Sequence, residues 1–486
     1  MRPKRIKELL ININESFPIF IICIAYLIIV VIALEINIYL SLGVFLLIII
    51  MFWRYKIRIV ALVFLIFLAF FQEQSKFSQE KQLEPYFKKE VMLIGVINNY
   101  PIRENGLSTY TLKVSQINSQ KLSSEILIDI SEFTYNKNIN YLDKIECIGV
   151  ISPNTIWQND FLRAKSLLGT AMCDNVERVD EYNGFSIFNN LVKFRSDLVQ
   201  KIEKQLNHPN ADLLFGMIFG GDADYSSHLK TDMQNSGTSH IMAVSGYNVN
   251  LVMSFLLIFS SNIKRKYLII ISSILLILYL FFVGWDNIPA KRAVIMQIYI
   301  IGGWLLGHKA NALYALCLAT IILCIDNIFV YKSLSFQLSF AATIGIVIFR
   351  EPVINFFEKI TKNKIIAEAL GITFVANIIT LPIIWMYFNQ ISIISIPINL
   401  LIAPLVPVVF ILGVIFIILL SFQINIDLLN YAMFWLLDLI IKIIDWSGSL
   451  TVATVTIKTN PVVVIVILLL LLFGISWTIY RKYNYE

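Results

Sequence analysis

The stretch Ser236-Gly-Thr-Ser-His-Ile-Met-Ala-Val-Ser-Gly-Tyr-Asn-Val-Asn250 decides how this chain is organised, because it places a glycine-punctuated polar cluster directly before an apolar run at residues 251–259. Polar groups facing lipid are costly unless paired, so such a cluster is expected to face other helices or a water-filled cavity. If the chain is helical from Thr238 onward, each residue turns about 100° and one face carries His240, Ser245 and Asn248. Close packing between membrane helices is the alternative interpretation of the same small and hydroxylated residues.

Hydrophobic residues make up 57% of the 486 residues, and charged residues make up 15%. This composition is far from that of a soluble protein and is typical of a chain that crosses a membrane several times. The N-terminus is basic, but a long apolar run and further spans follow it, which predicts a retained first helix rather than a cleaved signal. The sequence therefore predicts a polytopic α-helical membrane protein.

The formal net charge of +6 does not by itself indicate nucleic-acid binding. Residues 72–207 contain 16 basic and 17 acidic side chains, so the positive excess lies elsewhere. Most of it falls in short loops between predicted spans, where the positive-inside rule already explains it. By the same rule, the N-terminus is expected in the cytoplasm and residues 72–184 outside it.

Hydrophobic patterning divides the chain into four regions. Residues 1–71 are predicted to form N-terminal transmembrane helices, with spans at 17–34, 38–53 and 59–71. Residues 72–184 contain short alternating runs, which predict an inserted extracytoplasmic β-barrel of about five strands. Residues 185–236 are expected to form amphipathic and interfacial helices, and 237–486 the main transmembrane region. Its expected spans are 240–260, 267–283, 293–306, 311–325, 334–349, 366–387, 396–422, 428–446 and 462–480.

Two helices are expected between the barrel and the main transmembrane region. The first, at residues 185–206, is amphipathic, with Phe194 on its apolar side and Arg195 on its basic side. It is expected to lie along the outer membrane surface. The second, at residues 211–221, is too short to span and ends in paired glycines, which predicts an interfacial or re-entrant helix.

Candidate disulfide and metal residues are few. Cys147 and Cys173 are the only cysteines of the outer region, and an oxidising compartment favours a bridge between them. Two unpaired buried thiols are the alternative, because connectivity needs geometry. Asp222, Asp224 and His228 could hold a divalent ion, but a solvated turn is the expectation. We expect neither a metal nor a cofactor.

Lys291 and Arg292 interrupt the charge pattern, since they fall at the predicted outer end of a span. Phosphates favour arginine, so an anionic polymer arriving from outside would meet this pair early. Pairing with Asp286 or with lipid headgroups is the alternative. Further polar residues inside spans must find partners in helix contacts or in a wet pore: these include Gln297, Gln337, Ser339, Asn377 and Asn399.

Four stretches, in this order, resemble signature motifs of the ComEC competence family, bacterial inner-membrane proteins thought to pass single-stranded DNA during natural transformation. They are the opening stretch, Ile288-Pro-Ala-Lys-Arg-Ala293, Ser335-Phe-Gln-Leu-Ser-Phe340 and Asn399-Leu-Leu-Ile-Ala-Pro404. The chain departs from the family where Ser245-Gly-Tyr-Asn248 replaces Ser-Gly-Leu-His, where Ala290 follows Pro289 in place of serine, and at Lys332-Ser-Leu-Ser335.

The resemblance implies an OB-fold for the β domain and a channel for DNA in the membrane region. The residues expected to line the channel or contact DNA are Ser236, Gly237, Ser239, His240, Ser245, Gly246, Asn248, Asn250, Lys291, Arg292, Gln337, Ser339, Asn377 and Asn399. In the barrel, stacking aromatics could bind bases, although barrel core is the commoner role of such rings: these are Tyr100, Tyr110, Phe133, Tyr135 and Trp157.

An enzyme is not expected. Ala243-Val-Ser-Gly-Tyr247 lacks the first glycine of G-x-S-x-G, and no P-loop occurs. The H-x-H-x-D-H metal motif of the nuclease-like domain found in many relatives is also missing, so strand degradation is expected from another polypeptide.

The predicted function is uptake of single-stranded DNA through the bacterial inner membrane, with the lipid bilayer and separate receptor, helicase or nuclease proteins as partners. A transporter of another polar or anionic solute and a non-conducting scaffold are the alternatives.

Overall fold

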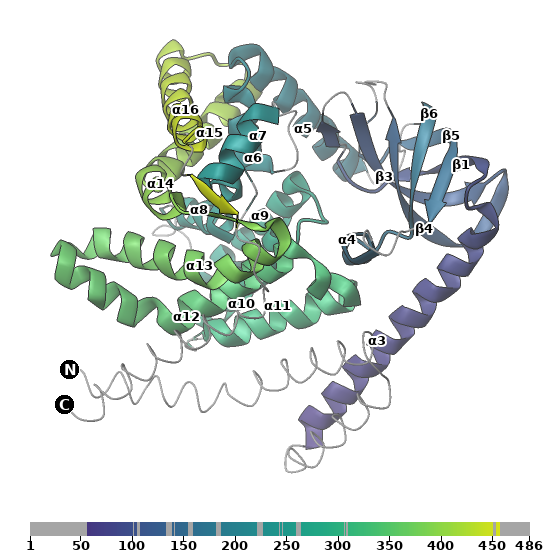
Figure 1. The fold of residues 1–486 in the computed structure, drawn as a ribbon, viewed down its shortest axis with the longest axis horizontal. Coiled ribbons are helices and arrows are strands. Elements are labelled where there is room, and N and C mark those ends of the chain that lie inside the picture. Colours follow the sequence, from purple (N-terminus) through teal and green to yellow (C-terminus); the bar gives the residue numbers. More distant parts are fainter. Residues whose placement is uncertain are drawn as a thin grey trace.

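A computed structural model describes residues 56–456 apart from gaps at 101, 105–106, 133–138, 140, 154–158, 181–185, 221–226, 243, 245, 259–263, 306, 308–309 and 451–452. The predicted spans at 17–34, 38–53 and 462–480 lie outside the described residues. The described chain begins with a long helix, α3 (Lys56–Leu83), and the short η1 (Glu84–Tyr86), which lead into a β domain. A larger helical region follows the β domain (Figure 1).

The β domain is a closed barrel. Its strands are β1 (Glu90–Ile97), β2 (Ile102–Glu104), β3 (Leu107–Ile117), β4 (Gln120–Glu132), β5 (Lys144–Pro153) and β6 (Gly169–Asp180). They follow the order β1-β5-β6-β4-β3-β2, and β1 also pairs with β3, which closes a ring of five strands. The β4–β6 pair is parallel, and the other pairs are antiparallel. The small β-barrel predicted from the alternating runs is thus confirmed.

Alternating side chains fill the barrel interior. Every second residue of β1 is buried, as the period-two pattern of a half-buried strand requires. Gly95 and Gly149 sit where the strand register shifts, and a Cβ there would come within 2.4 Å of Lys113 O and 2.2 Å of Met172 O. Only glycine allows the backbones to approach this closely, so these two positions are needed for closure.

Helices dominate the remainder of the described chain. Helix α4 (Asn159–Ala164) belongs to the loop between β5 and β6. The elements after the barrel are α5 (Ser186–Gln205), α6 (Asn210–Phe219), α7 (Ser227–Ser236), η2 (Ser239–Ile241), α8 (Gly246–Ile258), α9 (Arg265–Val283), α10 (Ile288–Leu305), α11 (Ala312–Asp326), η4 (Ile328–Lys332), α12 (Leu334–Thr361), α13 (Lys364–Phe388), β7 (Gln390–Ser392), α14 (Ser395–Ile402), α15 (Leu405–Ser421), α16 (Asp427–Gly448) and β8 (Thr454–Thr456).

Within the described residues, two helices are long and apolar enough to cross a membrane: α12 and the segment Ile366–Phe388 of α13. Helices α14 and α15 qualify together as a third, but they are bent by 43° relative to each other. The expected span at 396–422 is therefore a bent pair of helices. Pro404 lies at the break, and a proline inside a helix removes one backbone hydrogen bond and clashes with the preceding turn.

The opening polar stretch is not one helix. Helix α7 ends at Ser236, a single 3-10 turn covers Ser239–Ile241, and α8 begins only at Gly246. Gly237 causes the break, because its φ of +72° lies in the left-handed region that favours glycine. The expectation that His240 and Asn248 share one helical face is therefore wrong.

Two buried clusters organise the helical region. The larger one joins α5, α6 and α7 to α14, α15 and α16, and nine of the ten residues of α6 are buried. The smaller one joins α8, α9 and α10. Helix α6 thus lies inside the protein, and its interfacial or re-entrant position stays a prediction.

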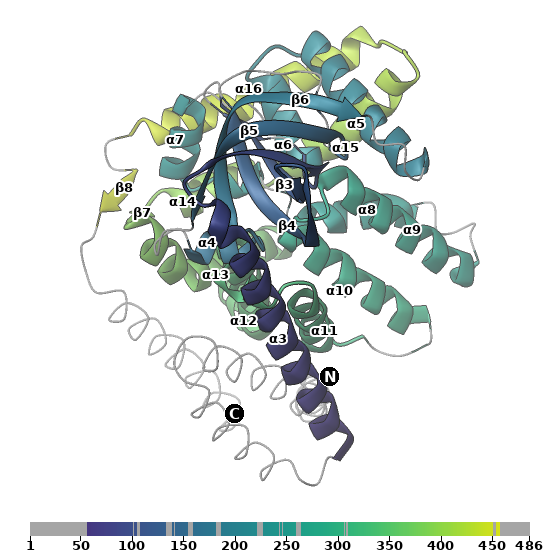
Figure 2. The same ribbon diagram turned by 90° about the vertical axis from the view of Figure 1, so that its right-hand side faces the viewer.

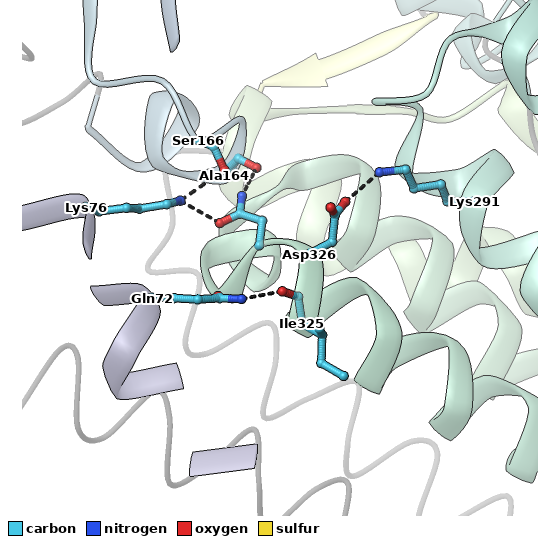
Figure 3. A network of polar contacts seen from close by, with 8 residues as sticks. Gln72, Lys76, Ala164, Ser166, Lys291, Ile325 and Asp326 are labelled. Carbon is cyan, nitrogen blue, oxygen red and sulfur yellow. Dashed lines mark hydrogen bonds and ion pairs between the residues drawn. The ribbon is translucent and has the colours of Figure 1, made fainter. Parts of the chain in front are cut away.

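Polar contacts fasten the barrel to the helical region through α3 and the α4 loop (Figure 3). Lys76 Nζ lies 2.8 Å from Asn327 Oδ1 and 3.0 Å from Ser166 Oγ. Asn327 Nδ2 donates to the carbonyl oxygens of Ala164, at 2.6 Å, and Arg163, at 3.2 Å. Burial, together with the nearby charge of Arg163, lowers the pKa of Lys76 to about 8. The Asn327 side chain therefore links α3, the end of α4 and the start of η4.

Candidate functional site

The first and second sequence stretches meet at Gly246 and Arg292. Gly246 opens α8, and a Cβ there would lie 2.9 Å from Nη2 of Arg292 on α10. Arg292 is only 8% exposed. The absence of a side chain at Gly246 thus lets the guanidinium lie directly against the start of α8.

Arg292 also reaches α12, the helix that carries the third stretch. Its Nη1 donates to Oγ1 of Thr343 on α12 and lies 3.4 Å from Sδ of Met296. The Thr343 hydroxyl in turn donates to the backbone oxygen of Ser339, at 2.8 Å, one turn earlier in the same helix. Helices α8, α10 and α12 are therefore joined at one guanidinium.

The charge of Arg292 has no counter-charge among the described residues. Neither of its contacts is a carboxylate, and its Nε is buried without a hydrogen-bond partner. A buried cation normally requires a paired anion, because desolvation of the charge is costly. Arg292 therefore has unused capacity to bind an anion.

The neighbouring Lys291 has a different environment. Its Nζ lies 2.5 Å from Oδ2 of Asp326 at the end of α11 (Figure 3). The same atom lies 5.1 Å from the ring centre of Trp285. The ion partner is thus Asp326 rather than Asp286. Lys291 already has an acidic partner, whereas Arg292 has none among the described residues. Of the two adjacent cations, Arg292 therefore has the greater capacity to bind an anion.

The first and fourth stretches meet at Gly237 and Asn399. Asn399 Nδ2 donates to the backbone oxygen of Gly237, at 3.3 Å. A Cβ at Gly237 would lie 2.5 Å from Cβ of Ser395, so a larger residue would separate the end of α7 from α14. Asn399 Oδ1 and Ser392 Oγ are both buried without a partner, which leaves two polar atoms available at this junction. Ser236 is buried beside it and shares a 2.7 Å hydrogen bond with Thr238.

Asn248 and Asn250 hold the first turns of α8. Asn248 Nδ2 donates to the backbone oxygen of Met217 on α6, at 2.8 Å, and Asn250 accepts a hydrogen bond from Gln297 on α10. Both asparagines of α8, and Gln297 with them, therefore find hydrogen-bond partners between helices.

Other predicted residues lie apart from these contacts. Gln337 Nε2 donates to Tyr331 O at 2.9 Å and to the Tyr387 hydroxyl at 3.2 Å, and Asn377 donates to Thr373 within its own helix. Ser239 and His240 are exposed. Ser245, Phe133, Tyr135 and Trp157 lie outside the described residues.

Cys147 and Cys173 lie on the neighbouring strands β5 and β6, and both are buried thiols in this structure. Their disulfide stays a prediction. Among the described residues, His228, Asp232 and Asp445 have ligand atoms within 4.8 Å of one another. His228 belongs to the trio that the sequence marked, and its other members, Asp222 and Asp224, lie outside the described residues. The absence of a metal site also stays a prediction.

Sequence reasoning missed Thr343 and misplaced Arg195. Thr343 lies two turns beyond Ser335 on the same helix, and a hydroxyl in an apolar span was the available signal. Arg195, expected on the basic side of its helix, is 7% exposed, whereas Phe194 is 42% exposed. Tyr110, one of the proposed stacking residues, is fully buried in the barrel and donates to Glu132 Oε1 at 2.7 Å.

Comparison with known proteins identifies the family. The model of the competence protein family matches residues 217–482, more than half of the chain. The chain belongs to this family. It is 23% identical over 260 residues to ComE operon protein 3 of Bacillus subtilis (strain 168), an alignment that covers 52% of this chain and 32% of the relative. The chain therefore aligns with about a third of the length of that relative, and no solved structure matches it.

The region that the family model matches contains the residues through which the four stretches contact one another. Gly237, Gly246, Arg292, Thr343 and Asn399 all lie between residues 217 and 482. The barrel and helix α5 precede the matched region. Membership of the family thus rests on the part of the chain in which the four stretches meet.

Proposed function

We propose that this chain takes up single-stranded DNA through the bacterial inner membrane during natural transformation, as a multi-pass protein with a cytoplasmic N-terminus. Family membership supports a role in competence, and the apolar helices α12 and α13 support a location in the membrane. The barrel, with five closed strands and one parallel pair, is proposed to be an OB-fold that receives the strand outside. We propose no enzymatic activity. Separate proteins would supply the receptor, helicase or nuclease.

The observation that carries the proposal is the unpaired charge of Arg292 where three helices meet. Phosphodiesters are anionic, and an arginine can offer them two parallel N–H donors. Thr343 and Gly246 fix the guanidinium from two sides, which leaves its orientation defined. A phosphate passing this point would supply the missing counter-charge.

The test compares two adjacent cations. Arg292→Gln removes the unpaired charge, whereas Lys291→Gln removes an equally buried charge that Asp326 already neutralises. We expect Arg292→Gln to lower internalisation of labelled DNA into a nuclease-protected cytoplasmic pool by about tenfold or more, given the usual strength of hydrogen bonds to charged groups. Lys291→Gln should lower it by less than about threefold. Membrane abundance of each variant is measured in parallel.

Equal uptake by Arg292→Gln and the unaltered protein would remove Arg292 from the mechanism. Uptake that persists after deletion of the whole gene would refute the proposed function. Profiling of polar and anionic solutes would then test the alternative cargo.

A further inference from the structure

The arginine of helix α5 has an environment that family membership does not explain. Arg195 lies on the first helix after the barrel, before the region that the family model matches. Its helix is amphipathic, and the usual place for a charged residue on such a helix is the solvent face. Arg195 is nevertheless 7% exposed, at the junction of the barrel with the helical region. Figures 1 and 2 show α5 between the barrel and the yellow-green C-terminal helices.

Aromatic rings from two elements surround the guanidinium. Its central carbon lies 3.5 Å from the ring centre of Tyr100, which follows β1. The corresponding distances are 5.0 Å to Phe215 and 5.8 Å to Phe219, both on α6. Tyr100 is itself held in place, because its hydroxyl donates to the backbone oxygen of Phe281 at 3.2 Å and its ring lies 5.0 Å from that of Tyr141.

Polar partners are absent from this environment. Arg195 makes no hydrogen bond or ion pair with any described residue, and its Nε is buried without a partner. Burial lowers the pKa of Arg195 to about 10, so the side chain stays charged at neutral pH. Cation–π contacts return only about 0.5–2 kcal/mol each, and they leave the buried Nε–H donor without an acceptor.

Nearby contacts connect Arg195 with the family stretches. Helix α6, which carries two of the three rings, also receives Asn248 through Met217 O. Tyr279 on α9 donates to the next backbone oxygen, that of Ile218, at 3.0 Å. A single short helix therefore separates the arginine from the start of α8.

We propose that Arg195 binds a backbone phosphate of single-stranded DNA where the strand passes from the barrel to the helical region. The inference rests on the proposed function and deepens it by adding a contact outside the matched family region. Arginine held among aromatic rings beside a small barrel is an arrangement suited to single strands, since rings provide stacking surfaces and the cation binds phosphate. The phosphate would satisfy donors that the protein leaves unpaired.

The test is the salt dependence of binding by the full chain in detergent micelles, with a fluorescent oligothymidine as the probe. Each phosphate neutralised in a single strand contributes about 0.7 to the slope of log affinity against log salt. Arg195→Met should flatten that slope by about 0.7 and weaken binding about tenfold at moderate salt. Lys204→Met removes an equal charge from the exposed part of the same helix and should leave the slope unchanged.

An unchanged slope for Arg195→Met would overturn the proposal and leave Arg195 as a packing residue. If the methionine variant is not monodisperse, Arg195→Lys takes its place, because it keeps the charge but loses the planar fork. That variant should keep the slope and bind about tenfold more weakly at every salt concentration. Binding equal to that of the unaltered protein would contradict the inference.

Two further outcomes separate this inference from the function on which it rests. If the unaltered chain binds no oligonucleotide, the proposed function itself fails. If anionic lipid raises the thermal stability of the unaltered protein but not of Arg195→Met, while DNA binding is equal, the ligand is a lipid headgroup and the DNA assignment is wrong.

Discussion

Asn327 is the residue whose loss should loosen the barrel most. Its side chain takes part in four hydrogen bonds: two donated to the carbonyl oxygens of Arg163 and Ala164, one accepted from Lys76 and one accepted from the Phe329 amide. A neutral hydrogen bond contributes about 0.5–1.5 kcal/mol net, and one to a charged group about 1.5–3 kcal/mol. Allowing for non-additivity, Asn327→Ala should weaken the attachment by about 3–5 kcal/mol.

Native-state hydrogen exchange measures this attachment locally. The amides of Lys165, Ser166 and Leu167 bond within the α4 turn that Asn327 holds. If these amides exchange through local opening, a loss of 3 kcal/mol lowers their protection by about two orders of magnitude. Barrel amides such as that of Leu168, which bonds to Leu127 O, should change little.

Two control variants sharpen the comparison. Asn327→Asp keeps both acceptor contacts and loses both donor contacts, so it should fall between the unaltered protein and the alanine variant. Ser166→Ala removes one bond donated by the charged Lys76 and should cost about 1.5–3 kcal/mol, less than the loss of Asn327. Unchanged protection of the α4 turn in Asn327→Ala would refute the view that this side chain fastens the barrel.

Three more predictions follow from single contacts. Gly448→Ala should destabilise the protein by about 1–3 kcal/mol, because the new Cβ would lie 2.5 Å from the backbone of Asp232. In Gly413→Ala the nearest neighbours of the new Cβ are the flexible side-chain ends of Leu214, Ile218 and Met433, so the cost should stay below about 1 kcal/mol. Equal melting temperatures in detergent would contradict this difference. Burial raises the pKa of Glu132 above its ordinary value of 4.5, so between the two pKa values the folded barrel binds more protons than the unfolded chain. The stability of the barrel should therefore fall as pH rises from 4.5 through the folded-state pKa of Glu132. Glu132→Gln should abolish this pH dependence, measured as the protection of barrel amides. A double-mutant cycle of Lys291→Gln and Asp326→Asn, measured by thermal melts, should give a coupling energy of at most about 1 kcal/mol, because the Asp326 side chain is 57% exposed. A larger coupling energy would show that solvent screens this ion pair less than its exposure implies.

Sequence reasoning located most elements because their signals are local. Alternating apolar residues predicted the strands β1, β3, β4 and β5, and amphipathic periodicity predicted α5 over nearly its full length. Both signals depend on residues within a few positions of one another. The family resemblance, too, was visible in four short stretches of sequence.

Local signals failed where a backbone break or a distant partner decides the outcome. The positive φ of Gly237 ends a helix that composition alone would continue. Periodicity could not bury Arg195 and expose Phe194, because the rings that receive the arginine come from Tyr100 and α6.

The sequence by itself predicted a polytopic membrane protein, and it determined the barrel and the motifs that mark the family. Only the tertiary structure decided which of two adjacent cations is paired: Lys291 meets Asp326, 35 residues away, whereas Arg292 meets Gly246 and Thr343 and no acid in the part of the chain that the structure describes. The physical reason is that charge pairing depends on distances of a few ångströms between side chains on different helices. Those distances are set by packing, and no spacing along the chain encodes them.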